Sequence, residues 1–395
     1  DIPKFNKSKP INVPIYYKKA LYNNTIASVK ARYRNFDDAM GFGAGLMAYW
    51  ALIFLFGIIH NLMSKLAPTL LLNITKKTSS WAPVRYYRKF ISIPATFRSQ
   101  HVERNVFRGL VPTRLESLVV FGFFVLVVVF EATRYHYVEN DTIWPKKDVQ
   151  MARYVGDRTA VISLFLSVLT FLLAGRNNIM LWLTGWKQST FITYHKWIAR
   201  ITVLSSAAHG IAMFADSVWM GKYGTRKLTD WYRWGCVAMV AATILFLQAV
   251  SFLRVWNYEV FLYIHIAMAV IFLVGVWRHC ENFSYDQWAF ACAAIWVFDR
   301  AVRIGRIISF GTRDATVTIV SNETLQVTVP KRKWWKSFPG AYGYVYFLKS
   351  AVFWQSHPFT IVEEAADHVK FYIKIKKGAT EHIYKKLLNE PNYSG

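Results

Sequence analysis

The chain has 395 residues, of which 54% are hydrophobic and 17% aromatic, and 16 of the aromatic side chains are tryptophan. This composition is typical of a polytopic membrane protein rather than of a soluble domain. In a soluble protein the formal net charge of +25 would suggest a nucleic-acid partner, but here the basic residues cluster between apolar spans, so we expect none. The three cysteines lie in or beside apolar segments, which excludes a disulfide framework and a CxxC metal motif.

The N-terminal part combines a polar segment, a first span and a basic connection. The chain starts at Asp1 without a methionine or a signal peptide, so we expect a processed or trimmed product. Residues 1–41 are polar and carry a glycosylation sequon at Asn23. Residues 42–62 form an apolar segment of about twenty residues, which is long enough to cross a bilayer. The connection 63–114 then contains ten Lys and Arg residues and a single acidic residue.

Six more apolar segments follow, so the sequence predicts a helical bundle of about seven spans. Their expected ranges are 115–133, 159–174, 191–215, 231–254, 258–279 and 287–308. The positive-inside rule places the connection 63–114 in the cytoplasm, together with the arginines in the last turns of the final span and beyond it: Arg300, Arg303, Arg306 and Arg313. The sequons at Asn23, Asn140 and Asn282 then lie on the outer side. We therefore expect the N-terminus outside and the C-terminal region in the cytoplasm.

Four histidines stand in two matched pairs on two of these spans. His195 and His209 lie on one, His265 and His279 on another, and each pair is separated by fourteen positions. Fourteen residues turn a helix almost four times and rise about 21 Å, so the two members of a pair face the same way at two depths. Because one span, 231–254, separates the two helices, they run parallel across the membrane. His195 is then level with His265, and His209 with His279.

Facing imidazoles at one depth can occupy both axial positions of a haem iron. A lone histidine in an apolar helix is more often a packed or hydrogen-bonded core residue, but two identical spacings on parallel helices are hard to attribute to chance. Zinc, the alternative metal, requires ligands that converge on one tetrahedral centre. We therefore predict an inner haem held by His195 and His265, and an outer haem held by His209 and His279.

Two further residues on these spans are candidates for the site. Phe272 lies midway between His265 and His279 in sequence and returns near the ligand face, so its ring could bridge the two haems; the alternative is an ordinary core side chain. Arg200 follows His195 by five residues, roughly 140° from the haem face. It could pair with a haem propionate or with a neighbouring helix, because a lone charge in a membrane is costly.

After Phe310 the pattern changes from membrane helix to soluble β structure. Residues 315–329 alternate apolar and polar side chains on either side of an Asn-Glu turn, which predicts an antiparallel hairpin. Further strands are expected at 340–347 and 369–375. Between these strands stands HPFTI, residues 357–361, which we read as a strand end. A basic turn that contains Gly378 precedes a helix expected at 380–388. Such a turn could hold an anionic cofactor, although many small barrels have one.

Paired membrane histidines fourteen residues apart, followed by a β domain with HPFTI, resemble the ferric reductase and NADPH oxidase superfamily. The resemblance covers residues 42–395 and is closest to the fungal-type ferric-chelate and cupric reductases. It implies an antiparallel β-barrel domain that binds FAD after the membrane bundle. It also implies electron flow in the plasma membrane from cytosolic NADPH through FAD and two b-type haems to ferric or cupric chelates outside.

The resemblance also assigns residues and domains. The expected FAD-binding residues are His357, Pro358, Phe359 and Thr360 at the flavin, Lys374 near the diphosphate, and Gly378 and Thr380 in the turn that follows. The expected domains are an outer segment 1–41, a first helix 42–62, a basic connection 63–114, a six-helix two-haem domain 115–309 and a partial FAD-binding barrel 310–395. The family's nicotinamide domain is missing from the sequence, so we expect a fragment of a longer protein whose NADPH site lies elsewhere.

Several alternatives remain open at this point. The acceptor could be dioxygen, as in an NADPH oxidase, or the chain could be a b-cytochrome fed by another donor. It could also be a structural or transport membrane protein that has lost these sites. Four outer acids are candidates to attract a metal substrate, although solvated surface acids are commoner: Asp216, Asp230, Glu281 and Asp286. Membrane lipid is an expected partner, and homo-oligomerisation is left open.

Overall fold

The structure is a computed structural model that describes residues 19–97, 111–249, 257–336, 338, 340–348, 356–376 and 379–389. The chain divides into two compact units, Asp1–Val302 and Arg303–Gly395, which are called here the helical unit and the β unit.

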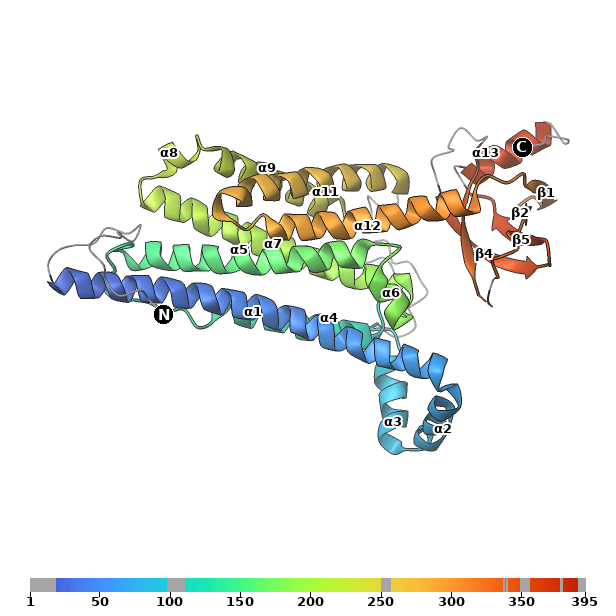
Figure 1. Ribbon diagram of the computed structural model, residues 1–395, viewed down its shortest axis with the longest axis horizontal. Helices are drawn as coiled ribbons and strands as arrows, with labels where there is room; N and C mark the ends of the chain where they lie inside the picture. Colours follow the sequence, from blue (N-terminus) through green and yellow to red (C-terminus); the bar gives the residue numbers. More distant parts are fainter. Residues whose placement is uncertain are drawn as a thin grey trace. The chain divides into compact units, whose positions relative to one another are not determined.

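In the described part of the chain, seven helices of 19 or more residues coincide with the expected spans (Figure 1). They are α1 (Lys19–Leu66), α4 (Arg114–Ala132), α5 (Lys147–Ala174), α7 (Gln188–Trp219), α9 (Asp230–Gln248), α11 (Tyr258–Cys280) and α12 (Gln287–Phe310). Five of them, α1, α4, α5, α7 and α11, are long and apolar enough to cross a membrane. The described parts of α9 and α12 do not meet that criterion, so the membrane character is confirmed and the count of seven spans is not.

Shorter helical segments connect the long helices. They are α2 (Pro68–Ser79), α3 (Ala82–Tyr87), η1 (Arg88–Ser92), α6 (Ile179–Thr184), α8 (Tyr223–Arg226) and η2 (Glu281–Phe283). Figure 1 shows α2 and α3 at one end of α1, within the basic connection.

The first helix is longer than the sequence predicts, because α1 starts at Lys19 and has no break at residue 41. Its N-terminal part buries small apolar side chains such as Ala31 and Ala39. It also binds the connection after α4: the Asn35 amide donates to the carbonyl of His136 (3.2 Å) and accepts from its main-chain N–H (3.0 Å). Packing and these bonds extend the helix beyond the apolar run from which the span was predicted.

Two sets of helices make up the core of the helical unit. One set, α1, α4, α5 and α7, encloses fully buried side chains that include Trp50, Phe123 and Leu166. The other set is the pair α9 and α11, which pack closely along each other. A Cβ atom at Gly275 of α11 would lie 2.9 Å from the Cβ of Ala238 and 3.0 Å from its main chain. Small residues therefore let these two helices approach, as is common in membranes.

The β unit contains an antiparallel sheet of five strands in the order β1-β2-β5-β4-β3. The strands are β1 (Thr316–Ser321), β2 (Thr324–Pro330), β3 (Tyr342–Tyr346), β4 (Ser356–Glu364) and β5 (His368–Lys374), and α13 (Ala379–Asn389) follows. The predicted hairpin is confirmed as β1 and β2. In the described residues β1 and β3 are unpaired edges, so a sheet is confirmed and a closed barrel is not. Leu325, Phe371 and Ile373 form its core with Leu387 of α13.

One buried arginine closes the end of α4. Arg158 of α5 is 1% exposed, and its guanidinium donates to the carbonyls of Phe130 (3.1 Å), Thr133 (2.6 Å) and Arg134 (3.1 Å). The last carbonyls of a helix have no partner within the helix, so these bonds satisfy groups that would otherwise be buried without one.

We expect Arg158→Met to lower the free energy of unfolding by about 1–3 kcal/mol for each carbonyl left buried and unsatisfied. Thermal unfolding of the purified protein in detergent measures this. Arg278→Met, which removes a half-exposed arginine paired with Glu281, is the matched control and should have little effect. Equal unfolding temperatures for the two variants would contradict the assigned role.

Candidate functional site

The structure brings the four histidines together in two pairs across α7 and α11. The ring centroids of His195 and His265 are 6.3 Å apart, and those of His209 and His279 are 6.1 Å apart. The ring planes are inclined by 72° in both pairs. The two levels therefore have nearly the same geometry.

Hydrogen bonds hold three of these rings through Nδ1 to main-chain carbonyls. The bonds run from His195 to Thr170 O (3.0 Å), from His209 to Gly156 O (2.8 Å) and from His279 to Trp231 O (2.8 Å). Because a carbonyl can only accept, the proton of each ring lies on Nδ1 and the lone pair is left on Nε2. Metal-binding histidines usually have this arrangement, in which the second nitrogen is fixed by an outer partner. The fourth ring, His265, contacts the side chain of Gln248 instead (3.1 Å).

These distances fit an iron atom held between each pair. Two metal–imidazole bonds of about 2 Å would place the facing nitrogens about 4 Å apart. Each ring centroid lies a ring radius behind its nitrogen, which brings the expected separation of centroids to about 6 Å. The observed separations of 6.3 and 6.1 Å agree with this value. The residues therefore fit two six-coordinate haems, one at each level.

A glycine of α9, Gly235, makes room for the His279 ring of α11. A Cβ atom at Gly235 would lie 2.7 Å from Nδ1 and 3.0 Å from Cε1 of His279, closer than side-chain contacts allow. The ring also packs against Trp231 and Phe283, with centroid distances of 6.0 and 5.8 Å. Gly235 was not predicted as a site residue; its one visible signal in the sequence is a glycine within an apolar helix, four residues after Trp231.

The two other candidates on these helices have the following surroundings. Phe272 is half-buried on α11. Thr202, the matching position on α7, is buried, and its hydroxyl bonds to Ile198 O (2.8 Å) and to Thr170 Oγ1 (3.1 Å). The guanidinium of Arg200 lies over the Trp197 ring of its own helix, 4.8 Å from the centroid.

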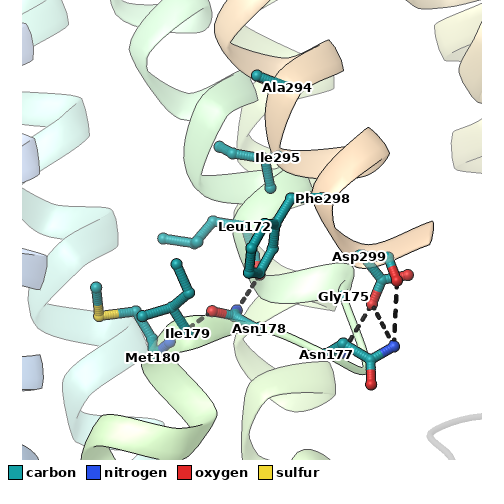
Figure 2. A pocket seen from close by; sticks show the side chains of 10 residues that line it. All are labelled: Leu172, Gly175, Asn177, Asn178, Ile179, Met180, Ala294, Ile295, Phe298 and Asp299. Carbon is teal, nitrogen blue, oxygen red and sulfur yellow. Dashed lines mark hydrogen bonds between the residues drawn. The ribbon is translucent and has the colours of Figure 1, made fainter. Parts of the chain in front are cut away.

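A pocket of about 260 Å³ lies where the end of α5 and the start of α6 meet α12 (Figure 2). Its wall is mainly apolar, and Asp299 and Asn177 close one side of it. The Asp299 carboxylate accepts from the main-chain N–H of Asn177 (2.7 Å). The main-chain carbonyl of Asp299 accepts from the side-chain amide of Asn177 (3.2 Å). Leu172 lines the pocket two residues after Thr170, so the pocket lies at the level of the inner pair. The Asp299 bonds attach this end of α5 to α12.

The outer acids do not form a cation site in the described part of the chain. Asp216 is fully buried and pairs with Arg226 (2.5 Å), and Glu281 pairs with Arg278 (2.5 Å). No group of three or more His, Cys, Asp or Glu side chains among the described residues could hold a metal ion. The expectation that Asp216 is an accessible acid is therefore wrong, because its side chain is buried near the end of α7 and its counter-charge comes from Arg226 of α8.

In the β unit, HPFTI lies inside β4 rather than at a strand end. The first half of β4 pairs with β3 and only the second half with β5, so Pro358, which has no N–H, occupies a stretch with one neighbour. Side chains alternate between the two faces. Pro358 and Thr360 are exposed, whereas His357 and Phe359 are half-buried, and Phe359 packs on the core. The four predicted flavin residues therefore lie on two faces of the sheet.

The remaining predicted FAD residues are only partly described. The Thr360 side chain is exposed, and its hydroxyl makes no hydrogen bond with any described residue. Lys374 is exposed and pairs with Glu323 (3.2 Å). The buried Thr380 hydroxyl exchanges two bonds of 2.9 Å with the main chain of Lys376. Gly378 lies outside the described residues.

Arg303 was missed as a site residue, because the sequence showed it only as one of the basic residues after the last span. Its guanidinium donates to the Tyr346 hydroxyl (3.0 and 2.5 Å) and to the Ser356 hydroxyl (3.3 Å), next to His357. It therefore joins the ends of β3 and β4 beside HPFTI.

Comparison with known proteins finds two domain families. Residues 159–276 match the ferric reductase like transmembrane component, and residues 309–394 match an FAD-binding domain. The chain is 40% identical to a probable ferric reductase transmembrane component of Candida albicans, over 89% of this chain and 53% of the relative. It is also 40% identical to ferric/cupric reductase transmembrane component 1 of the same species (89% and 47%). The identity to ferric reductase transmembrane component 3 of Saccharomyces cerevisiae is 32% (96% and 53%). The chain thus spans about half the length of the curated relatives it matches.

We expect Gly235→Ala to displace the His279 ring and to remove the haem predicted at the outer pair while the inner one is retained. The added methyl group would occupy the space of the imidazole. Haem content and the reduced-minus-oxidised absorption spectrum of the purified protein measure this. Gly41→Ala, at a helical glycine with open space around it, is the control. Full haem content in Gly235→Ala would contradict the expectation.

Proposed function

We propose that the chain belongs to the ferric reductase family and forms the membrane and flavin-binding parts of a transmembrane metalloreductase. In this proposal electrons pass from cytosolic NADPH to ferric or cupric chelates outside the cell. The observation that carries it is the pair of matched histidine levels, in which the facing rings have centroids 6.3 and 6.1 Å apart and three of the four rings donate Nδ1–H to carbonyls, which leaves the lone pair on Nε2. A structural or transport protein without cofactors would have no use for this tautomer at two levels.

We assign His195 and His265 to the inner haem, and His209 and His279 to the outer one. When bound, FAD converts a two-electron donor into single electrons, and the haems carry these electrons across the membrane. The protein's part is to fix both rings of each pair at the distance that two metal–nitrogen bonds require. Phe272, midway between the levels on α11, is proposed to fill the space between them. Arg200, near the inner level, remains a candidate partner of a propionate.

Topology and domain order follow from the same proposal. We propose seven spans, with α9 and α12 added to the five apolar helices, an outer N-terminus and a plasma-membrane location. The basic connection 63–114 and the arginines after the last span support a cytoplasmic β unit. We keep the proposed domains 115–309 for the two haems and 310–395 for part of an FAD-binding barrel, with the NADPH site outside this chain.

For FAD we propose that the exposed face of β4 receives the flavin. Pro358 and Thr360 lie on that face, and Thr360 offers a hydroxyl without a partner among the described residues. Phe359 and His357 support the strand from the other face. We retain Lys374 as a cationic residue for the diphosphate, and Gly378 and Thr380 as the turn beside it.

The relatives named above are ferric or ferric/cupric reductases, which favours a metal chelate over dioxygen as the acceptor. The test is an assay of the purified full-length protein with NADPH and either a ferric chelate or dioxygen alone. We expect reduction of the ferric chelate to exceed superoxide formation and to require two haems per chain. Superoxide as the main product would favour the oxidase, and absence of haem would refute both.

His209→Ala and His279→Ala are expected to abolish the outer haem and leave the inner haem largely bound, because the two levels lie about 21 Å apart along the helices. The measurement is haem content per chain together with potentiometric titration. His195→Ala and His265→Ala are the matched variants and should remove the inner haem instead. Loss of both haems from each single variant, in protein that is otherwise folded, would contradict the separation of the levels.

Thr360→Ala is expected to weaken FAD binding, because it removes the hydroxyl that we assign to the flavin, while the haem spectrum is retained. Flavin fluorescence during titration of the purified protein measures the affinity. Thr328→Ala, at a threonine on β2 of the same sheet, is a control that should leave FAD affinity unchanged. An unchanged affinity in Thr360→Ala would refute the assignment.

A further inference from the structure

The two histidines of α7 and the two carbonyls of α5 to which they donate have the same spacing along their helices. His195 and His209 are fourteen residues apart on α7, and their acceptors, the carbonyls of Thr170 and Gly156, are fourteen residues apart on α5. The two helices run antiparallel, so the later histidine meets the earlier carbonyl. Each level on this side of the site is thereby fixed by the main chain.

The helices α9 and α11 do not repeat this register. His279 donates to the carbonyl of Trp231, and the carbonyl fourteen residues further along α9 belongs to Leu245. The ring of His265 instead contacts the side chain of Gln248, three residues later, where α9 ends. At this one position of the four, a side chain takes the place of a main-chain carbonyl.

In the structure the amide nitrogen of Gln248 lies 3.1 Å from Nδ1 of His265. In this orientation it would donate to Nδ1, and the ring proton would then lie on Nε2 and block a metal. A ring that binds a metal through Nε2 requires the amide oxygen at Nδ1 instead. The amide oxygen and nitrogen occupy nearly the same volume, and a half-turn of the amide exchanges them. The Gln248 Oε1 atom is buried without a hydrogen-bond partner among the described residues, so no hydrogen bond there opposes the half-turn.

The geometry points to Gln248 as the positioning residue of His265: its amide oxygen accepts the Nδ1 proton and thereby fixes the tautomer and orientation of this inner ligand. This inference rests on the proposed function, because it requires a haem at the inner pair. The acceptor at Nδ1–H also sets how strongly the ring donates to a metal. Gln248 therefore tunes the reduction potential of the inner haem without affecting the outer one, which lies about 21 Å away along the helix.

The test compares Gln248→Met with Gln248→Glu in the full-length protein by potentiometric titration of both haems. Methionine has a similar length but offers only a weak acceptor, so the ring becomes a poorer donor and the potential of the inner haem rises. Glutamate places a negatively charged acceptor on Nδ1–H, so that potential falls. The outer haem keeps its potential in both variants. Thr243→Val, an exposed substitution on the same helix, is the control and shifts neither haem.

Opposite shifts separate an acceptor from a packing residue, because a packing defect would move both variants the same way. Loss of the inner haem from Gln248→Met alone, with glutamate retaining it, also supports the inference. Shifts of the same sign, no shift, or loss of the inner haem from both variants would overturn it. Failure of the proposed function is a different result, since the unsubstituted protein would then bind no haem pair.

Discussion

The hydrogen bonds at Nδ1 are the constraint on which the site depends. An imidazole in a membrane helix can rotate and exchange tautomers, but once Nδ1 donates to a carbonyl the lone pair lies on Nε2, which is then the nitrogen that can bind a metal. The antiparallel packing of α5 on α7 supplies a carbonyl at each level, fourteen residues apart, as the histidines are. The spacing in the sequence is thus matched by a second spacing, on another helix, that no histidine motif reveals.

Close helix packing then determines which residues the neighbouring positions can hold. His279 reaches the carbonyl of Trp231 only because position 235 has no side chain, and α11 reaches α9 only because Gly275 meets Ala238. These glycines are needed for a close approach, not for an unusual backbone angle, since they lie within regular helices. They link the packing of the bundle directly to the orientation of the His279 ring, a proposed haem ligand.

Much of this arrangement was predictable from the sequence, because apolar length and a fourteen-residue repeat are local signals. The long helices and the hairpin of β1 and β2 lie where expected. The extension of α1 toward Lys19 was missed because it depends on bonds between Asn35 and His136, about a hundred residues away. Gly235 and Gln248 were missed for the same reason: their roles depend on which helix lies opposite. The alternation of HPFTI between two faces was overlooked because those residues were read as a strand end.

The two histidine levels can differ where the hydrogen-bond partner of a ring is a side chain and not a main-chain carbonyl. The distance between the levels is set by the rise of the helix, so side-chain changes hardly alter it. Three of the four ring partners are main-chain carbonyls, which a point substitution cannot replace. The two histidine pairs have nearly equal separations and the same inclination. A difference in potential between the two proposed haems would therefore come from the surroundings of the pairs, and the Gln248 side chain is the place where the hydrogen-bond partners of the four rings break the symmetry.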